Sequence, residues 1–596
     1  MSLPTKNPKT TKANIEDIYA LSPMQQGMLF HSVYAKGSGE YFQQFSCDIE
    51  GELNIEIFEQ VWQELVNIHP VLRTVFIWEN RKKPLQVVYK QVKISIKQED
   101  WQAFSTDEQK DRLLVYLAED RNKSFNLSKA PLMRLTLIQM GIKKYRFIWS
   151  HHHIILDGWS IPIVLEQLFL IYESLNKGQK INLPYLPNYR SYIDWLDKQN
   201  LEKAKQFWSN LLLGFTTPTK LSIENTLSTT SKQEVNYNQE ESLLSKDQTT
   251  NLQTCAKQYQ LPMNVLIQGA WGLLLNHYSN ESDIVYGSVV SGRPTSLKDT
   301  DKMIGLFINT LPVRIKINKS QYLTDYLKQL HEQLIAIREY EYSPLSEVQT
   351  WSQIERGQSL FDTILVYENY PIDFSLQEYK GALSLRNPKV IERTNLPITV
   401  QIFPAEQILI RIIYDSSRFE PKAINQILEH LKTILREITL NPNQLLSQVS
   451  LMSQAEKEEL LYTWNNTYCD YDREITIHQL FEHQVIKSPS STAIIFEDKE
   501  LSYKELNEKA NQLAHFLRKL GVTADSRVGL LIDRSSEMMI ALLAILKAGA
   551  AYVPLDSSYP KDRISYMIDD AQLSVLITQN SLSSLASLYI GNTVFI

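Results

Sequence analysis

The chain contains little cysteine and no long apolar run. Its 596 residues include three cysteines, Cys47, Cys255 and Cys469. Their wide separation excludes a disulfide framework and a thiolate zinc site and fits a reducing compartment, so we expect a cytoplasmic protein. The longest notable apolar run, 538–546, stops at Lys547. A membrane-spanning helix needs about 20 such residues, and the N-terminus lacks the apolar segment of a secretory signal. We therefore expect no membrane association.

Positive charge is not in excess either. The chain has 61 Lys and Arg against 67 Asp and Glu, a formal net charge of −6. Because binding to nucleic acid depends on clustered positive charge, this balance gives no indication of a nucleic-acid partner. The apolar share of 43% is sufficient for large cores. At roughly 150 residues per domain, the length predicts about four domain-sized units.

Helical and strand-like segments alternate along the chain and predict an α/β protein. Ser22 and Gln25 have capping-box spacing around Pro23, which predicts a helix start there. The β-branched run Asp283–Val290 predicts a strand. The texture changes near Pro442. The predicted parts are a flexible arm (1–15), an α/β region (16–180), a second α/β region (181–440), a linker (441–475) and a further α/β region (476–596).

The last region begins with two capped helices and continues as a βαβ unit. A strand at 528–532, a helix at 536–547 and a second strand at 552–555 are expected. The turn between the first strand and the helix lacks the GxGxxG pattern that holds a dinucleotide phosphate. We therefore predict no nucleotide site in this unit.

A histidine cluster carries the most chemical information. His151, His152 and His153 end a strand-like run, and Asp157 and Gly158 follow before Ser160, which is expected to cap the next helix. Side chains at such a strand-to-helix corner can point into a cleft. Histidine can accept or donate a proton near neutrality, because its unperturbed pKa is about 6.5.

Two other interpretations of the cluster compete with catalysis. The histidines could be purely structural. They could also bind a metal, but adjacent residues on a strand point to opposite faces, and no second group of histidines, cysteines or carboxylates stands out. We therefore predict no metal site. The spacing HHxxxDG selects His152 and His153, and leaves His151 as the extra histidine.

HHxxxDG followed by Trp-Ser resembles the signature of condensation domains of non-ribosomal peptide synthetases, within the chloramphenicol-acetyltransferase-like superfamily. Six further segments resemble that family's other motifs, in the family's order over residues 16 to about 440. They are Leu21–His31 (LSPMQQGMLFH), His69–Phe76 (HPVLRTVF), Tyr189–Trp195 (YRSYIDW), Tyr286–Pro294 (YGSVVSGRP), Ile304–Arg314 (IGLFINTLPVR) and Phe361–Pro371 (FDTILVYENYP). Arg73, in the second of these, is expected to form a structural ion pair rather than to take part in catalysis.

The closing region has a resemblance of its own. Leu501–Leu506 (LSYKEL) and Leu546–Asp556 (LKAGAAYVPLD) resemble the first two motifs of amino-acid adenylation domains. The later motifs of that family, among them a Ser/Thr/Gly-rich phosphate loop and a catalytic lysine, have no counterpart here. The resemblance thus implies the N-terminal subdomain of an acyl-adenylate-forming enzyme and no adenylation activity.

The resemblance implies a two-lobed fold, a pseudo-dimer of α/β sandwiches, with lobes at 16–180 and 181–440. It also implies a reaction. The α-amine of a carrier-bound aminoacyl thioester attacks an upstream carrier-bound peptidyl or aminoacyl thioester, and an amide forms. Two alternatives stay open, a stand-alone acyltransferase to a free amine or alcohol and a non-catalytic docking fragment. The intact histidine motif argues against the second.

The family's site residues carry over to five positions of this sequence. His153 is expected to be catalytic, either as a base or as a group that holds the amine. His152 is expected to pack on the other face. Asp157 is expected to order the corner through a salt bridge with Arg293, and Gly158 to keep the substrate tunnel clear.

The resemblance also implies partners rather than bound cofactors. The substrates would be carried on the phosphopantetheine of carrier domains, and no cofactor is expected on this chain itself. The downstream carrier would lie outside it. The upstream carrier would act in trans and dock on residues 1–20, since 12–20 resembles an acceptor docking region; the alternative is a disordered tail. A heterocyclisation domain would have aspartates in place of the histidines, and Asp157–Ser160 disfavours an epimerisation domain. The stereochemistry of the donor stays open.

Overall fold

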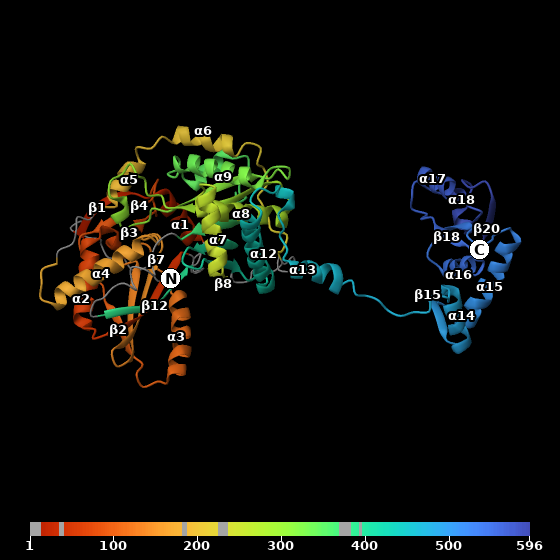
Figure 1. Cartoon of the computed structure of the whole chain (residues 1–596), viewed down its shortest axis with the longest axis horizontal. Coiled ribbons are helices and arrows are strands. Elements are labelled where there is room, and N and C mark those ends of the chain that lie inside the picture. Colours follow the sequence, from red (N-terminus) through yellow and green to blue (C-terminus); the bar gives the residue numbers. More distant parts are fainter. Residues whose placement is uncertain (1–13, 35–40, 182–186, 225–236, 369–382, 393–395) are drawn as a thin grey trace, which may run out of the picture. The chain divides into compact units, whose positions relative to one another are not determined.

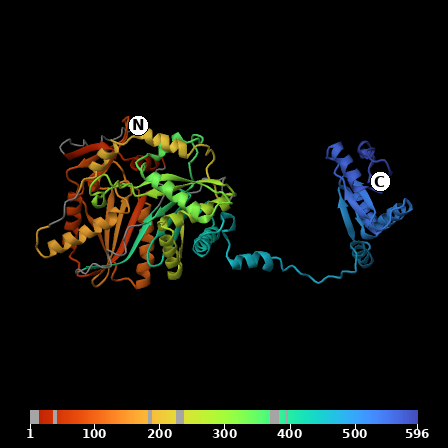
Figure 2. The same ribbon diagram turned by 45° about the horizontal axis from the view of Figure 1, so that its top comes forward.

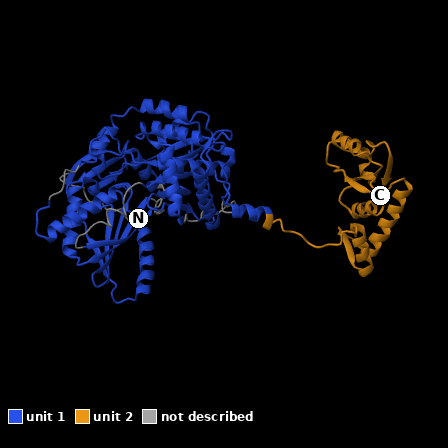
Figure 3. Ribbon diagram, viewed as in Figure 1, with its two compact units in different colours: residues 1–461 blue, residues 462–596 orange. Residues whose placement is uncertain are grey.

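A computed structural model describes residues 14–34, 41–181, 187–224, 237–368, 383–392 and 396–596 (Figure 1). The chain divides into two compact units, 1–461 and 462–596 (Figure 3). Most of the predicted arm and the last residues of the Phe361–Pro371 motif lie outside the described residues.

The N-lobe of unit 1 is an α/β layer. Its elements are β1 (Ile15–Ala20), α1 (Pro23–Tyr34), β2 (Phe42–Gly51), α2 (Ile55–Ile68), β3 (Thr74–Ile77), β4 (Leu85–Tyr89), β5 (Ile96–Asp100), α3 (Thr106–Arg121), β6 (Met133–Gly141), β7 (Lys144–His152) and α4 (Ser160–Asn176). The predicted cap of α1 is confirmed, since the Ser22 N–H donates to Gln25 Oε1 at 2.9 Å and the Gln25 N–H donates to Ser22 Oγ at 3.3 Å.

The N-lobe sheet places the histidine strand near its centre. The strand order is β12 (Leu383–Glu392), β2, β7, β6, β5, and β7 pairs antiparallel with both β2 and β6. Helices α2 and α4 pack on each other and share a core with the sheet. Trp62 on α2 lies 5.1 Å from Trp149 on β7 between ring centroids. Both tryptophans are fully buried, so the inner half of β7 is rigidly packed.

The C-lobe repeats this layering with a larger sheet (Figure 2). Its elements are α5 (Arg190–Leu196), α6 (Leu201–Leu211), β8 (Tyr237–Leu243), α7 (Lys246–Gln258), α8 (Met263–Ser279), β9 (Asp283–Val290), β10 (Asn309–Lys316), α9 (Leu323–Arg338), α10 (Leu345–Trp351), β11 (Thr363–Tyr367), β12 (Leu383–Glu392), β13 (Ile398–Phe403), β14 (Leu409–Asp415) and α12 (Pro421–Leu440). The predicted strand Asp283–Val290 is confirmed, with the same bounds.

The C-lobe sheet has the order β10-β9-β11-β13-β14-β8. Helix α12 begins with Pro421 in its first turn, and its apolar residues Ile424, Ile427, Leu431 and Ile434 follow the helical period. All four are fully buried in the C-lobe core, alongside α8. The C-lobe therefore has a hydrophobic core of its own.

Two segments do not lie where the division of the chain into lobes at 16–180 and 181–440 predicts. Strand β12 belongs by sequence to the C-lobe, yet it pairs antiparallel with β2 as an edge strand of the N-lobe sheet, where Figure 1 shows it in green among the orange strands. Past α12, Leu446 and Val449 are buried in the C-lobe core, and the short helix α13 (Gln454–Glu458) follows. Residues of the predicted linker before 450 are thus part of the folded C-lobe.

Unit 2 is a smaller α/β fold. Its elements are α14 (Ile477–Lys487), β15 (Thr492–Phe496), β16 (Lys499–Ser502), α15 (Tyr503–Lys519), β17 (Arg527–Leu531), α16 (Ser536–Lys547), β18 (Ala551–Pro554), α17 (Lys561–Ala571), β19 (Val575–Thr578), α18 (Ser583–Ala586) and β20 (Asn592–Phe595). The sheet β18-β17-β19-β20 is parallel throughout, and β17, α16 and β18 form the predicted βαβ unit.

Within the described ranges, no helix combines the length and the apolar character required to cross a lipid bilayer.

Candidate active site

The histidines lie where β7 turns into α4. His152 is the last residue of β7, and α4 begins at Ser160. The backbone N–H of His153 donates to the Tyr41 carbonyl at 2.8 Å, which continues the pairing with the segment before β2. Ser160 is the first helical residue rather than the predicted cap. Its N–H donates to Asp157 Oδ1 at 3.0 Å, so Asp157 supplies the side chain that satisfies this orphan donor.

The His153 ring is held through both nitrogens. Nδ1 lies 2.6 Å from the Leu156 carbonyl oxygen, and Nε2 lies 3.0 Å from Glu392 Oε1. A carbonyl oxygen only accepts hydrogen bonds, so Nδ1 carries a proton and Nε2 is the nitrogen whose protonation can change. The side chains of His153 and Glu392 are 8% and 17% exposed, so the pair is shielded from solvent.

Glu392 is the main group that favours the charged form of His153. Burial, the largest single effect, would lower the pKa of His153, but the hydrogen bond and charge of Glu392, together with the Leu156 carbonyl and the charge of Asp157, raise this pKa above its usual value. Burial would raise the pKa of Glu392, but the hydrogen bond and charge of His153 and the hydrogen bond from Gln43 lower this pKa instead. Each partner therefore favours the charged form of the other.

The other two histidines are neutral and buried. Burial, and then the charge of His153, lowers the pKa of His152 to about 3, and burial holds the pKa of His151 well below its usual value. His152 Nε2 lies 3.2 Å from Ser32 Oγ, and the Ile154 N–H donates to its Nδ1 at 3.1 Å. The structure thus directs His152 toward α1 and His153 toward Glu392.

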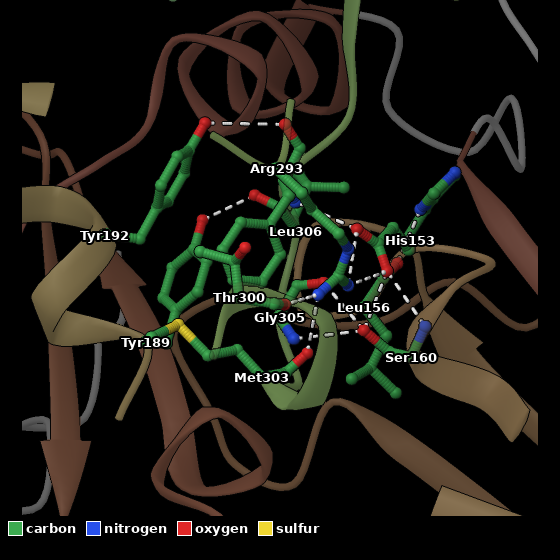
Figure 4. A network of polar contacts seen from close by, with 12 residues as sticks. His153, Leu156, Ser160, Tyr189, Tyr192, Arg293, Thr300, Met303, Gly305 and Leu306 are labelled. Carbon is green, nitrogen blue, oxygen red and sulfur yellow. Dashed lines mark hydrogen bonds and ion pairs between the residues drawn. The ribbon is translucent and has the colours of Figure 1, made fainter. Parts of the chain in front are cut away.

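Asp157 connects the two lobes and is fully buried. Its carboxylate accepts from Arg293 Nη2 at 3.1 and 3.3 Å, from Ser160 Oγ at 2.7 Å and from the Phe307 N–H at 3.1 Å. The predicted ion pair with Arg293 is present, and Asp157 lies just before the first residue of α4. Figure 4 shows this network, with Arg293 and Ser160 turned toward each other across the seam.

Arg293 is held as firmly as its partner. Its Nη1 donates to the carbonyls of Thr300 and Met303, and its guanidinium lies 4.2 Å from the Phe307 ring centroid. Gly292 before it has a φ of +59°, and a Cβ there would overlap the Phe307 carbonyl oxygen. Only glycine fits this close approach of the two chain segments.

A cavity of about 590 Å³ opens beside this network. Both lobes line it. The N-lobe contributes Met28, Tyr41, His153 and Gly158 among others, and the C-lobe contributes residues of α8, β9, β10, α9 and β11 together with Glu392. His153 and Gly158 therefore lie on the wall of one cavity, where a substrate can reach them.

Arg73 and the strand before α1 have structural contacts. Buried Arg73 pairs with Glu16 and also donates to the Val66 carbonyl at 2.9 Å, which agrees with the expected ion pair. Glu16 lies in β1, which pairs with β4. Asp17 pairs with Arg190 at 3.0 Å. Both acidic side chains of the expected docking segment are thus engaged inside unit 1, and residues 1–13 lie outside the described residues.

Glu392 was not found by sequence reasoning. It lies far along the chain from the histidines, on an edge strand that contains Pro388 and a register shift between Arg386 and Lys389. Proline and an interrupted alternation both weaken a strand signal. Among the described residues, no three His, Cys, Asp or Glu side chains form a cluster that could hold a metal ion.

The fold has two α/β lobes, and both line the cavity that contains His153. Comparison with known proteins shows which family has this arrangement. The family model "Condensation domain" matches residues 15–461, and the model "AMP-binding enzyme" matches 481–591. The chain belongs to the condensation-domain family, followed by part of an AMP-binding domain.

The similar proteins are peptide synthetases. The chain is 44% identical over 570 residues to a linear gramicidin synthase polypeptide of Brevibacillus parabrevis, covering 96% of this chain and 7% of that protein. It is 38% identical to bacitracin synthase 3 of Bacillus licheniformis, covering 95% and 9% respectively. A four-domain nonribosomal peptide synthetase bound to AMP and glycine superposes with a TM-score of 0.80 at 22% identity, over 98% of this chain and 45% of that one. The chain thus spans about a tenth or less of the length of these two curated relatives.

Proposed function

We propose that this chain forms peptide bonds between two carrier-bound thioesters in non-ribosomal peptide synthesis. The observation that carries the proposal is the place of His153, on the wall of a cavity lined by both lobes, with Nδ1 fixed by the Leu156 carbonyl. Family membership and the multidomain synthetases among its relatives support this reaction over transfer to a free amine or alcohol.

In the proposed reaction, the amine nitrogen of the acceptor attacks the donor carbonyl carbon, the C–N bond forms and the C–S bond breaks. The attacking amine loses a proton, and the departing thiolate gains one. His153 Nε2 either takes up the amine proton or holds the amine by a hydrogen bond. Asp157 and Arg293 hold the corner that carries His153, and Gly158 leaves space in the cavity.

The substrates in this proposal arrive on phosphopantetheine arms of separate carrier domains, one upstream and one downstream. Tethering raises the effective concentration of the two thioesters, so that positioning supplies much of the acceleration. Docking of the upstream carrier on residues 1–20 and a cytoplasmic location both stay predictions.

The proposal is tested with two separately loaded carrier domains. The protein is mixed with an aminoacyl donor carrier and an aminoacyl acceptor carrier, and the dipeptidyl acceptor is followed by intact-protein mass spectrometry. We expect product on the acceptor carrier, and much slower reaction with the same amino acid presented as a free amine. Equal rates with the free and the tethered amine would favour the stand-alone acyltransferase.

A further prediction concerns the AMP-binding part. The matched region, 481–591, contains neither the phosphate loop nor the catalytic lysine of adenylation domains. We therefore expect no amino-acid-dependent exchange of pyrophosphate into ATP by this chain. The exchange assay is run over the common amino acids, with a complete adenylation domain as the positive control. Exchange clearly above the background without amino acid would contradict the prediction.

A further inference from the structure

Strand β12 brings a carboxylate from the C-lobe chain to the catalytic corner. It pairs with the edge of β2 that faces away from β7. Its last residue, Glu392, is paired with Gln43 on β2, and Gln43 is paired with His151 on β7. Glu392 therefore reaches the end of β7 across one intervening strand. From there it contacts His153 Nε2, and both residues line the cavity.

The hydrogen bonds around Glu392 indicate that its carboxyl group is ionised. The side-chain amides of Gln43 and Gln401 both donate to its carboxylate, the latter at 3.1 Å. His151 Nε2 lies 2.8 Å from Gln43 Oε1, and this contact orients the Gln43 amide so that its nitrogen faces Glu392. Two amide donors favour the ionised carboxylate. The proton between Glu392 and His153 therefore rests on Nε2.

We propose that Glu392 is a positioning residue for His153, which holds the ring by Nε2 and determines when that nitrogen carries a proton. The inference rests on the function proposed for His153. The form of His153 that reacts is the one whose Nε2 has lost its proton to solvent. As the C–N bond forms, Nε2 takes the proton from the attacking amine, and Glu392 stabilises the resulting imidazolium. That proton then leaves with the thiolate released when the C–S bond breaks.

Other ionisable groups lie near His153 and Glu392 and contribute to the pH dependence of this pair. They are His151 and His152 on β7, Asp157 in the corner, Glu368 after β11 and Arg411 on β14. Of these, Glu368 gives the closest comparison. It lines the same cavity, and its Oε1 lies 3.3 Å from Gln401 Nε2, one hydrogen bond removed from Glu392.

Replacing the Glu392 carboxylate by an amide should lower the pKa of His153. Glu392→Gln keeps the shape and removes the negative charge that raises the pKa of His153. The pKa of His153 should therefore fall, so that Nε2 is free of its proton at a lower pH. The acid limb of the pH–rate profile should move to lower pH. Because a weaker base accepts a proton less readily, the plateau rate should also fall, by about 10- to 100-fold as for other histidine partners.

The experiment uses the full chain with histidine labelled at Cε1. The His153 signal is assigned by its loss in His153→Gln, and its titration is followed by NMR in the wild type, Glu392→Gln and Glu368→Gln, with the condensation rate measured over the same pH range. We expect the signal of Glu392→Gln to titrate at lower pH than that of the wild type. Glu368→Gln should shift it much less.

An unchanged titration and an unchanged acid limb in folded Glu392→Gln would overturn the proposal. If that variant folds poorly, Glu392→Asp replaces it. Its carboxylate is shorter and loses the contact with Nε2, so it must shift the titration in the same direction to a smaller extent. The experiment distinguishes failure of the proposed function from failure of the role of Glu392. Wild-type turnover by His153→Ala would contradict the catalytic role of His153. An inactive His153→Ala together with wild-type titration and turnover in Glu392→Gln would contradict only the role of Glu392.

Discussion

His153→Ala should lower peptide-bond formation by roughly 10²–10⁴-fold, the usual contribution of a general base. The physical reason is the fixed orientation of the ring. With Nδ1 bound to the Leu156 carbonyl, Nε2 is the nitrogen left to exchange a proton in a residue that lines the cavity, and alanine removes it. The rate is measured as dipeptidyl carrier formed under single-turnover conditions, with circular dichroism as the folding control. A folded alanine variant with wild-type turnover would contradict the role of His153.

His153→Gln separates the two roles that remain open for this residue. A glutamine amide can hold an amine by a hydrogen bond but cannot take its proton. If His153 is a base, glutamine should be as slow as alanine. If it holds the amine, glutamine should recover much of the rate.

The matched control for both variants is His151→Gln. His151 is buried beside His153, but its Nε2 contacts Gln43 and it does not line the cavity in the described structure. A glutamine amide can still donate to Gln43 Oε1 and keep the Gln43 amide turned toward Glu392, so this variant should keep turnover within a few fold while losing some stability. A loss as large as that of His153→Ala would mean that the whole histidine run, rather than His153, carries the rate.

Local patterns in the sequence predicted the corner well, because its signals lie within a few residues of one another. The spacing of His153, Asp157 and Gly158 placed the turn between a strand and a helix, where the structure has it. The Asp157–Arg293 ion pair came from family resemblance rather than from spacing, and it is present. Nothing local connects residues so far apart in the chain.

Long-range pairing explains what the sequence did not reveal. Glu392 meets His153 only because β12 leaves the C-lobe and joins the N-lobe sheet, and an edge strand with a proline has a weak pattern. The role of residues 15–20 was also hidden for this reason. They form β1 through pairing with β4, and β4 lies well beyond the first helix. A linear division into lobes cannot represent the crossing of β12 into the N-lobe sheet.

Asp157→Ala should destabilise unit 1 by about 3–5 kcal/mol, because removal of one partner from a buried ion pair leaves the other charge uncompensated. Arg293 would keep its contacts with the carbonyls of Thr300 and Met303, but no carboxylate would balance its charge. The Phe307 N–H would also lose its acceptor, at a further cost typical of a buried unsatisfied donor. Since these contacts join the lobes, the loss should appear as a lower midpoint in denaturant and a lower Tm.

A double substitution distinguishes the ion pair from general damage to the corner. In Asp157→Leu with Arg293→Met, both charges are removed, and apolar replacements of buried pairs are often tolerated. The double variant should therefore be more stable than Asp157→Ala alone, and Asp157→Asn should fall between Asp157→Ala and the wild type, because its amide oxygen can still accept from Ser160. Unfolding midpoints are compared at one protein concentration and one pH. If Asp157→Ala unfolds together with the wild type but has lost turnover, Asp157 takes part in the chemistry and the structural role argued for it is wrong.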